Sequence, residues 1–230
     1  MRAFVLAGGL GTRLQPRFGE LPKPLAPIGG RPFLKHQLDW LRDRGIREAV
    51  LCVGHGAEQV RSTLGDGRTH GVRLIYSIEP EPLGTGGALK LAESHVDGPA
   101  LVVNGDTLPD CDPWQLEGAR WASAKLGAVG LFRVGDARER GRVEISPAGE
   151  VTAFVEKDPE HRGAAWVNGG IYAFHSALWR RLPAGASSLE RDILPALAHE
   201  HALLGHTFAG TFYDIGTPED WERAERELTR

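Results

Sequence analysis

The chain opens with the stretch Phe4-Val5-Leu6-Ala7-Gly8-Gly9-Leu10-Gly11-Thr12-Arg13, in which a short apolar run ends abruptly in glycines and an arginine. The apolar run predicts a strand over residues 3–7. A strand that ends in glycines can turn sharply and bring backbone N–H groups close to a ligand. Several N–H groups beside an arginine favour an anion such as a phosphate chain, although an ordinary glycine turn has the same sequence. The stretch therefore predicts an opening strand followed by a candidate anion-binding loop.

Short apolar runs alternate with helical patterns through the first half of the chain. We expect strands over residues 48–53, 72–77 and 100–104, and helices over residues 32–44, 57–64, 85–95 and 113–125. Strands that alternate with helices favour right-handed crossovers and a mostly parallel sheet, with ligands bound outside the carboxyl ends of the strands. The predicted fold class is therefore α/β, with a Rossmann-like mixed, mostly parallel central sheet flanked by helices.

The second half of the chain has a more mixed pattern, without an internal repeat or a low-complexity linker. We expect strands over residues 128–133, 142–145, 151–155 and 167–174, a helix over residues 189–199 capped by Ser188, and a last helix that begins at Thr217. Pro147-Ala148-Gly149 predicts a hairpin turn between the second and third of these strands. The sequence therefore predicts one domain over residues 1–230.

The composition describes a chain that can bury a core and that has no strong charge imbalance. Of its 230 residues 41% are hydrophobic, and the formal net charge is −3. This charge argues against bulk electrostatic binding to nucleic acid, and no apolar stretch reaches the length of a membrane span. The two cysteines form no disulfide framework, and the chain runs from Met1 into a strand without a signal peptide. We expect a cytoplasmic protein with no nucleic acid and no membrane among its partners.

A single lysine lies between two prolines in the segment Pro22-Lys23-Pro24. The prolines restrict the backbone of Lys23 and reduce the entropy lost when its ammonium is held still. A positive charge at a fixed place can stabilise charge that develops on phosphorus, although a surface lysine in an extended loop has the same pattern. The dinucleotide fingerprint GxGxxG fails because the third position after Gly11 is Leu14, and the P-loop fingerprint lacks its GK[ST]. An NAD(P)-dependent oxidoreductase is therefore disfavoured.

Together, the glycine loop and the lysine segment resemble the signature of the sugar-nucleotide pyrophosphorylases, the nucleotidyltransferases that act on sugar 1-phosphates. Later stretches match the family in the same order, at residues 79–88, 101–106, 154–157, 168–172 and 212–218. The resemblance implies that residues 1–125 form mainly a nucleotide-binding half of the domain. Residues 126–230 would form mainly its sugar-phosphate-binding half.

The resemblance implies a nucleotide site built around the glycine loop and the segment after the third strand. Its nucleotide-binding residues would be Leu6, Ala7, Gly8, Gly9, Gly11, Thr12, Arg13, Lys23, Glu79, Gly84, Thr85 and Gly86. The catalytic residues would be Arg13, Lys23 and Asp106. Asp106 and Asp214 would hold the cofactor Mg²⁺, which takes one or two carboxylates together with phosphate oxygens and waters. The two aspartates are far apart in the sequence, so their meeting depends on the fold.

On the sugar side, the resemblance implies contacts mainly from the second half of the chain. The sugar-phosphate-binding residues would be Asn104, Gly141, Glu156, Lys157, Asn168 and Gly169. Lys157 would pair with the sugar phosphate, and Glu156 would accept hydrogen bonds from sugar hydroxyls. The sequence departs from the family at Arg140, because many relatives carry a tyrosine before the glycine that Gly141 matches. The departure concerns the local sugar contacts and not the class of protein.

The side chain at position 79 bears on the choice of nucleotide. Guanine presents N1–H and an exocyclic amine side by side, two donors that suit a carboxylate, whereas uracil presents one N–H flanked by two acceptors. The resemblance places Glu79 where relatives carry their base-reading side chain, so GTP is favoured over UTP. Residues 21–27, 188–195 and 214–220 are most similar to the D-glycero-D-manno-heptose 1-phosphate guanylyltransferases, with N-acetylmuramate 1-phosphate uridylyltransferases as the alternative.

The expected activity is Mg²⁺-dependent transfer of a nucleotidyl group from an NTP to a sugar 1-phosphate, which gives an NDP-sugar and pyrophosphate. A non-catalytic nucleotide-sugar sensor is the alternative from another class, and it would have lost Lys23 or a metal carboxylate. A histidine-based hydrolase is disfavoured because the nine histidines are scattered without metal-ligand spacing. A monomer and a homodimer are both compatible with the sequence.

Overall fold

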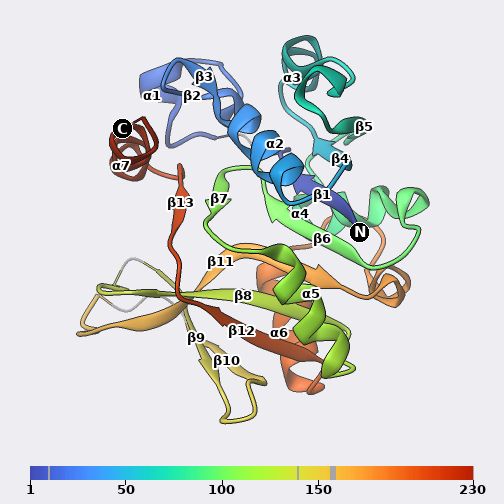
Figure 1. Ribbon diagram of the computed structural model, residues 1–230, viewed down its shortest axis with the longest axis vertical. Helices are drawn as coiled ribbons and strands as arrows, with labels where there is room; N and C mark the ends of the chain where they lie inside the picture. Colours follow the sequence, from blue (N-terminus) through green and yellow to red (C-terminus); the bar gives the residue numbers. More distant parts are fainter. Residues whose placement is uncertain (10, 139, 156–158, 230) are drawn as a thin grey trace.

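The computed structural model describes residues 1–9, 11–138, 140–155 and 159–229, which fold around a nine-stranded sheet (Figure 1). Four strands of the first half lie side by side and parallel, in the order β5 (Arg73–Ile78), β4 (Glu48–Val53), β1 (Arg2–Leu6) and β6 (Ala100–Asn104). β4, β1 and β6 are apolar almost throughout, as expected of parallel strands that are buried on both faces.

The sheet continues through β11 (Ala165–Phe174), which is antiparallel to β6 on one edge and to β8 (Gly127–Val134) on the other. β12 (Leu203–Phe208) closes this side in parallel with β8. β9 (Arg142–Ile145) and β10 (Val151–Val155) form an antiparallel hairpin that joins β11. The sheet is therefore mixed, with its parallel part in the first half of the chain.

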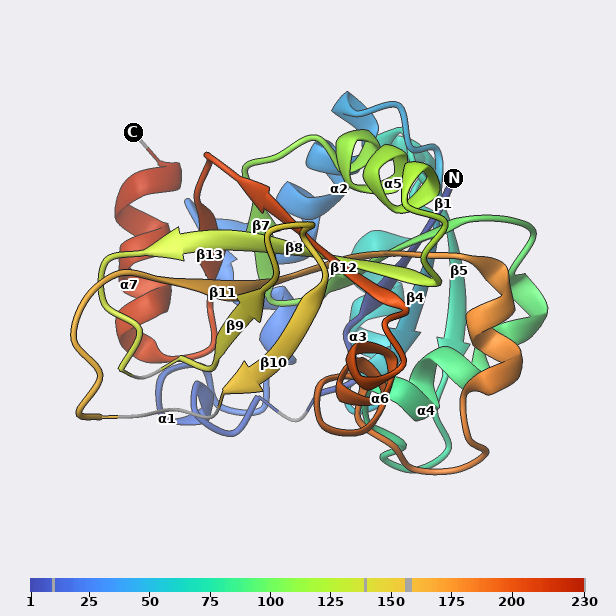
Figure 2. The same cartoon turned by 90° about the horizontal axis from the view of Figure 1, so that it is seen from below.

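Helices cover both faces of the sheet (Figures 1 and 2). α2 (Phe33–Asp43), α3 (Ala57–Leu64) and α5 (Pro113–Ala122) pack on one face, and α4 (Gly84–Leu91) and α6 (Leu194–His199) pack on the other. Alternate residues of each strand point to opposite faces. Val5 of β1 therefore belongs to the core beneath α2, and Phe4 belongs to the core beneath α4.

Two short ribbons lie outside the main sheet. β7 (Thr107–Pro109) pairs antiparallel with β13 (Phe212–Asp214), and β2 (Pro27–Ile28) pairs with β3 (Arg31–Pro32). α1 (Gln15–Phe18) and α7 (Pro218–Leu228) pack together near the second ribbon, where the Trp221 indole contacts Phe18 and donates to the Pro27 carbonyl at 2.9 Å. This small unit of α1, α7 and the β2·β3 ribbon connects the start of the chain with its end.

Short helical turns complete the fold. They are η1 (Lys23–Leu25), η2 (Arg68–His70), η3 (Glu93–His95), η4 (Ser176–Arg181) and the π-helical turn η5 (Leu189–Ile193). Among the described residues, none of the helices has both the length and the apolar character needed to cross a membrane.

The predicted fold class is confirmed, but three predicted helices differ in detail. The helix expected over residues 85–95 ends at Leu91 as α4, and residues 93–95 form the separate turn η3. The helix expected over residues 189–199 is a π-turn followed by α6, because Pro195 lacks the N–H of a helix interior and fits only the first turn of a new helix. The helix expected over residues 113–125 ends at Ala122, since Ala124 adopts a left-handed φ of 55°. β12 was not predicted, because Gly205 and His206 interrupt its apolar pattern.

Candidate active site

The candidate site lies at the carboxyl ends of β1 and β6. The parallel strands follow the order β5-β4-β1-β6, so the chain leaves β1 toward one side and later returns on the other side at β6. Such a reversal of strand order opens a crevice above the two strands. The N–H of Gly105 donates to the Leu6 carbonyl at 2.8 Å and ties the two strand ends together. The loops that follow β1 and β6 therefore meet at one edge of the sheet.

The glycine loop and the proline-flanked lysine meet at this edge. Gly11 has a φ of 62°, and a Cβ atom there would lie 2.7 Å from Cβ of Lys23, so only glycine fits this contact. Lys23 begins the turn η1, and its ammonium donates to Oδ2 of Asp106. The Lys23 side chain is only 11% exposed. The structure therefore brings together the loop, the lysine and the first aspartate that the sequence singled out.

The β7·β13 ribbon brings the second aspartate to the first. Asp214 lies opposite Thr107 in the ribbon, and the N–H of Ile215 donates to the Asp106 carbonyl at 3.0 Å. Burial raises the pKa of Asp214, and the negative charge of Asp106 raises it further, whereas Lys23 and Arg140 oppose this shift. The two carboxylates therefore belong to one electrostatic site, although they are more than one hundred residues apart.

The aspartate pair fits a hard divalent cation that shares its ligands with a phosphate. One oxygen of Asp214 accepts from the Gly216 N–H at 2.6 Å, and the other lies 3.6 Å from the Arg140 guanidinium. Within residues 1–9, 11–138, 140–155 and 159–229, no group of three or more His, Cys, Asp or Glu side chains could hold a metal ion. Two carboxylates without further protein ligands suit Mg²⁺, which keeps waters and phosphate oxygens, and not a structural zinc ion.

Glu79 lies beside the glycine loop, at the end of β5. A Cβ atom on Gly8 would lie 2.3 Å from Oε1 of Glu79, so the carboxylate can hold its present position only because residue 8 is glycine. Oε2 of Glu79 accepts from the Leu83 N–H at 2.9 Å. Burial raises the pKa of Glu79, and the hydrogen bond from Leu83 partly opposes it. One carboxylate oxygen is thus fixed by the backbone, and the other faces the loop that follows β1.

The segment at the start of α4 docks onto the second half of the chain. The N–H of Gly86 donates to the Ser187 carbonyl at 2.9 Å. The Thr85 hydroxyl donates to Oε2 of Glu190 at 2.7 Å and accepts from the Leu189 N–H at 2.7 Å. Gly84 to Gly86 were predicted to bind nucleotide, and in the structure the polar groups of Thr85 and Gly86 are engaged within the protein.

A cavity of about 900 Å³ is lined by Arg13 of the loop after β1 and otherwise by residues of the second half of the chain. It brings Arg13 together with Asp214 and with Gly141 and Asn168, which were predicted to bind the sugar phosphate. Its remaining lining residues are Arg140, Arg142, Val143, Phe154, Val155, Val167, Glu190, Arg191, Thr217, Glu219 and Asp220. The lining combines charged side chains with the apolar residues Val143, Phe154, Val155 and Val167.

Asn168, which was predicted to bind the sugar phosphate, is held by hydrogen bonds within the protein. It donates to the hydroxyl of the fully buried Tyr172 at 2.8 Å and accepts from the Gly170 N–H at 2.9 Å. The Oδ1 atom of Asn104 is buried and has no hydrogen-bond partner among the described residues. Gly169 is needed for packing, because a Cβ atom there would lie 2.3 Å from the Phe132 ring.

The other predicted residues lie at the rim of the site or outside the described part of the chain. Leu6 ends β1, and Ala7 donates to the Cys52 carbonyl at 2.8 Å. Gly9, Thr12 and Arg13 are exposed. The predicted sugar-phosphate residues Glu156 and Lys157 lie outside the described residues.

No functional role was predicted for Gln37, which lies beneath the turn that carries Asp106 (residues 104–107). Its side chain is 1% exposed, and its amide donates to the carbonyls of Asn104, at 2.8 Å, and Thr107. The two carbonyls flank Asp106. A signal was present, because Gln37 occupies the core-facing side of α2 together with Leu34, Leu38 and Leu41. Glu190 and Arg191 were also missed as residues that line the cleft.

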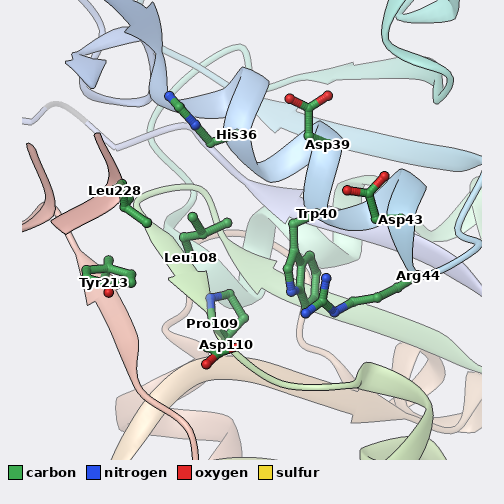
Figure 3. A pocket seen from close by; sticks show the side chains of 10 residues that line it. All are labelled: His36, Asp39, Trp40, Asp43, Arg44, Leu108, Pro109, Asp110, Tyr213 and Leu228. Carbon is green, nitrogen blue, oxygen red and sulfur yellow. The ribbon is translucent and has the colours of Figure 1, made fainter. Parts of the chain in front are cut away.

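A second cavity of about 410 Å³ lies behind the β7·β13 ribbon (Figure 3). Leu108 and Tyr213 face each other across the ribbon and line this cavity, and the next pair, Thr107 and Asp214, points to the opposite side. In Figure 3, Trp40 of α2 reaches toward Pro109, whereas Tyr213 lies on the far side of the cavity. Neither Asp106 nor Asp214 lines this second cavity, whereas Asp214 lines the larger one.

A glycine loop, a fixed lysine and a pair of aspartates at the ends of parallel strands define a protein that handles a phosphate chain. Residues 2–230 match the family model of the nucleotidyl transferases, and the chain belongs to this family. The resemblance read from the sequence is thereby confirmed.

Relatives of two lengths match the chain. It is 36% identical to a mannose-1-phosphate guanylyltransferase catalytic subunit beta of Drosophila pseudoobscura pseudoobscura. The alignment of 224 residues covers 96% of this chain but only 60% of that relative. It is also 35% identical to the D-glycero-alpha-D-manno-heptose 1-phosphate guanylyltransferase of Aneurinibacillus thermoaerophilus. That alignment of 230 residues covers 99% of this chain and 98% of the relative. The chain thus spans about 60% of the length of the first relative and nearly all of the second.

A solved structure has the same fold. HddC from Yersinia pseudotuberculosis, complexed with GMP-PN, superposes with a TM-score of 0.86 at 29% sequence identity, over 99% of both chains.

Proposed function

We propose that the protein transfers a guanylyl group from GTP to a sugar 1-phosphate, with release of pyrophosphate. The favoured acceptor is D-glycero-α-D-manno-heptose 1-phosphate. The observation that carries the proposal is the convergence of the glycine loop, Lys23, Asp106 and Asp214 at the carboxyl ends of β1 and β6. Family membership and the guanylyltransferase names of both relatives support the same reaction.

The reaction needs no nucleophile from the protein. An oxygen of the sugar 1-phosphate attacks the α-phosphorus of GTP in line, a new P–O bond forms, and the bond to the β-phosphate oxygen breaks as pyrophosphate leaves. Catalysis then consists of positioning and charge neutralisation. Lys23 lies where it can stabilise the transferred and leaving oxygens, and the glycine loop with Arg13 would hold the β- and γ-phosphates.

Asp106 and Asp214 would hold Mg²⁺ between them and the phosphates. When bound, this ion neutralises charge on the phosphate oxygens and lowers the barrier to displacement. The backbone holds Asp214 through the Gly216 N–H, and Gln37 holds the turn that carries Asp106. Both carboxylates are therefore positioned before a substrate arrives.

The proposed preference for guanine rests on Glu79. Its free oxygen faces the loop after β1, and the N1–H and exocyclic amine of guanine are the donors that a carboxylate pairs with best. The HddC complex supports guanine, because its named ligand contains GMP. The heptose is supported by the relative of equal length, and mannose 1-phosphate, named for the longer relative, is the second candidate acceptor.

A substrate panel tests the proposal. Purified protein with Mg²⁺ is incubated with GTP, UTP, dTTP, CTP or ATP, each with a series of sugar 1-phosphates, and pyrophosphate release is measured. We expect the fastest release with GTP and the heptose 1-phosphate. Faster release with UTP would keep the reaction but overturn the role of Glu79, and no release with any pair, with nucleotide binding intact, would indicate the non-catalytic sensor.

A further inference from the structure

We propose that Arg140 is a phosphate-binding residue that pairs with Asp214 in the metal-free protein and binds the sugar phosphate when a metal ion occupies Asp214. The inference rests on the proposed function, because it needs a metal ion and a sugar phosphate in the same cleft. The juxtaposition that motivates it is an arginine placed between a metal-site carboxylate and the sugar side of the cavity.

The site holds two carboxylates and two cations in matched pairs. Lys23 pairs with Asp106, and Arg140 lies 3.6 Å from Oδ2 of Asp214. Half-buried carboxylates need counter-charges, because an uncompensated charge is strongly unfavourable away from water. A divalent ion bound by both aspartates would satisfy them by itself. Lys23 would then be available to phosphate groups, and Arg140 would keep Asp220 as its only carboxylate partner among the described residues, with one terminal nitrogen released.

Arg140 is held in place independently of Asp214. Its other terminal nitrogen lies 3.0 Å from Oδ1 of Asp220, and its guanidinium lies 5.2 Å from the centre of the Phe212 ring. Asp220 is fixed in turn, because its backbone N–H and its carboxylate both bond to the Thr217 hydroxyl. Arg140 can therefore release Asp214 without leaving the cleft.

The position of Arg140 suits the incoming phosphate. It lines the large cavity together with Gly141, Asn168 and Arg13. Its side chain is 24% exposed, so a phosphate can reach it. A guanidinium presents a fork of N–H donors that matches phosphate oxygens. Arg140 would thus contact the sugar phosphate, whereas Lys23 would serve the nucleotide.

Two measurements on Arg140→Gln test the inference. The first is Mn²⁺ binding to the protein without substrates, followed by electron paramagnetic resonance. The variant should bind Mn²⁺ about fivefold more tightly, the scale of one partly exposed ion pair, because the competing cation is gone. The second is steady-state kinetics, in which KM for the sugar 1-phosphate should rise about 10- to 100-fold while KM for GTP stays within about twofold.

Arg17→Gln is the matched control. Like Arg140, Arg17 pairs with a carboxylate of α7, because its guanidinium lies 3.0 Å from Oε1 of Glu222. Its guanidinium also lies 4.3 Å from the centre of the Trp221 ring. These contacts are on the other side of α7 from Asp220. Arg17→Gln should leave Mn²⁺ affinity unchanged. Arg140→Lys keeps the charge, so it should restore wild-type Mn²⁺ affinity while KM for the sugar phosphate stays raised.

The outcomes separate the two proposals. Tighter Mn²⁺ binding in Arg140→Gln together with a selective rise in the sugar-phosphate KM supports the inference. Unchanged or weaker Mn²⁺ binding, with a wild-type protein that turns over GTP, overturns the inference and leaves the proposed function standing. A wild-type protein that neither binds Mn²⁺ nor releases pyrophosphate overturns both.

Discussion

At the scale of the residue, the site depends on charges that the fold places in pairs. The ammonium of Lys23 is bound to Asp106, and its backbone is held by prolines on both sides and by the turn η1. Holding the charge before the substrate binds avoids a reorganisation cost during the reaction. Glu79 is preorganised in the same way, since the Leu83 N–H fixes one of its oxygens.

Lys23→Ala should lower kcat/KM for pyrophosphate release about 10²- to 10³-fold, the usual effect of removing one preorganised charge from a transition state. Circular dichroism should show an unchanged fold, because the lysine head group lies in the cleft. Lys35→Ala on α2 is the control and should keep wild-type turnover. Turnover in Lys23→Ala within a few-fold of the wild type contradicts the role of this residue.

Glu79→Gln should weaken the use of GTP more than that of UTP. A charge-assisted hydrogen bond is worth about 1.5–3 kcal/mol, so kcat/KM for GTP should fall about 10- to 100-fold while the value for UTP changes little. The measurement is pyrophosphate release with each nucleotide at a fixed sugar 1-phosphate concentration. An equal loss for both nucleotides would show that Glu79 does not read the base.

At the scale of the element, the β7·β13 ribbon is what assembles the aspartate pair. Three residues from each strand suffice to set Asp214 opposite Thr107, directly beside the turn that holds Asp106. The side-chain amide of Gln37 on α2 stabilises this turn by donating hydrogen bonds to two of its carbonyl groups. The ribbon could not be predicted from the sequence, because three-residue strands carry no measurable periodicity and their pairing joins distant parts of the chain.

Gln37→Met removes the amide donors and leaves the carbonyls of Asn104 and Thr107 without a partner. Each unsatisfied buried group costs about 1–3 kcal/mol, so the free energy of unfolding in urea should fall by roughly 2–4 kcal/mol. The Mg²⁺ concentration for half-maximal turnover should also rise, because the turn that carries Asp106 loses its hydrogen bonds to residue 37.

Leu38→Ala separates this effect from a general loss of stability. Leu38 is fully buried on the same face of α2, and its truncation should cost about 2–5 kcal/mol. It should leave the Mg²⁺ midpoint unchanged. Equal midpoints in Gln37→Met and the wild type would mean that Gln37 has a purely structural role.

Thr217 caps α7 by accepting from the Asp220 N–H, and its hydroxyl also donates to the Asp220 carboxylate. Thr217→Ala should lower the free energy of unfolding by about 1 kcal/mol, because the Asp220 N–H loses its acceptor. Thr217→Ser keeps the hydroxyl and should be close to the wild type in the same urea titration. If Ala and Ser variants are equally stable, the cap contributes nothing measurable.

At the scale of the whole molecule, segments from the beginning, middle and end of the chain meet at the candidate active site. The parallel strands could be predicted, because strands buried on both faces are continuous apolar runs between glycines and polar turns. β12 could not be predicted, because its glycine and histidine interrupt the apolar pattern. Its partner β8 also lies more than seventy residues earlier in the chain. Lys23 and Asp106 were marked by their local sequence, whereas Arg140 and Gln37 acquire a role only from neighbours that the fold supplies.

The central claim is that Lys23, Asp106 and Asp214 form one metal-dependent nucleotidyl-transfer centre. The most direct test is pyrophosphate release from GTP and the heptose 1-phosphate as a function of Mg²⁺ concentration, in the wild type, Asp106→Asn and Asp214→Asn. We predict that release requires the divalent ion and that each variant loses about 10²- to 10³-fold in kcat/KM, because each lacks one charge of the pair. Release without a divalent ion, or variants within a few-fold of the wild type, would contradict the claim.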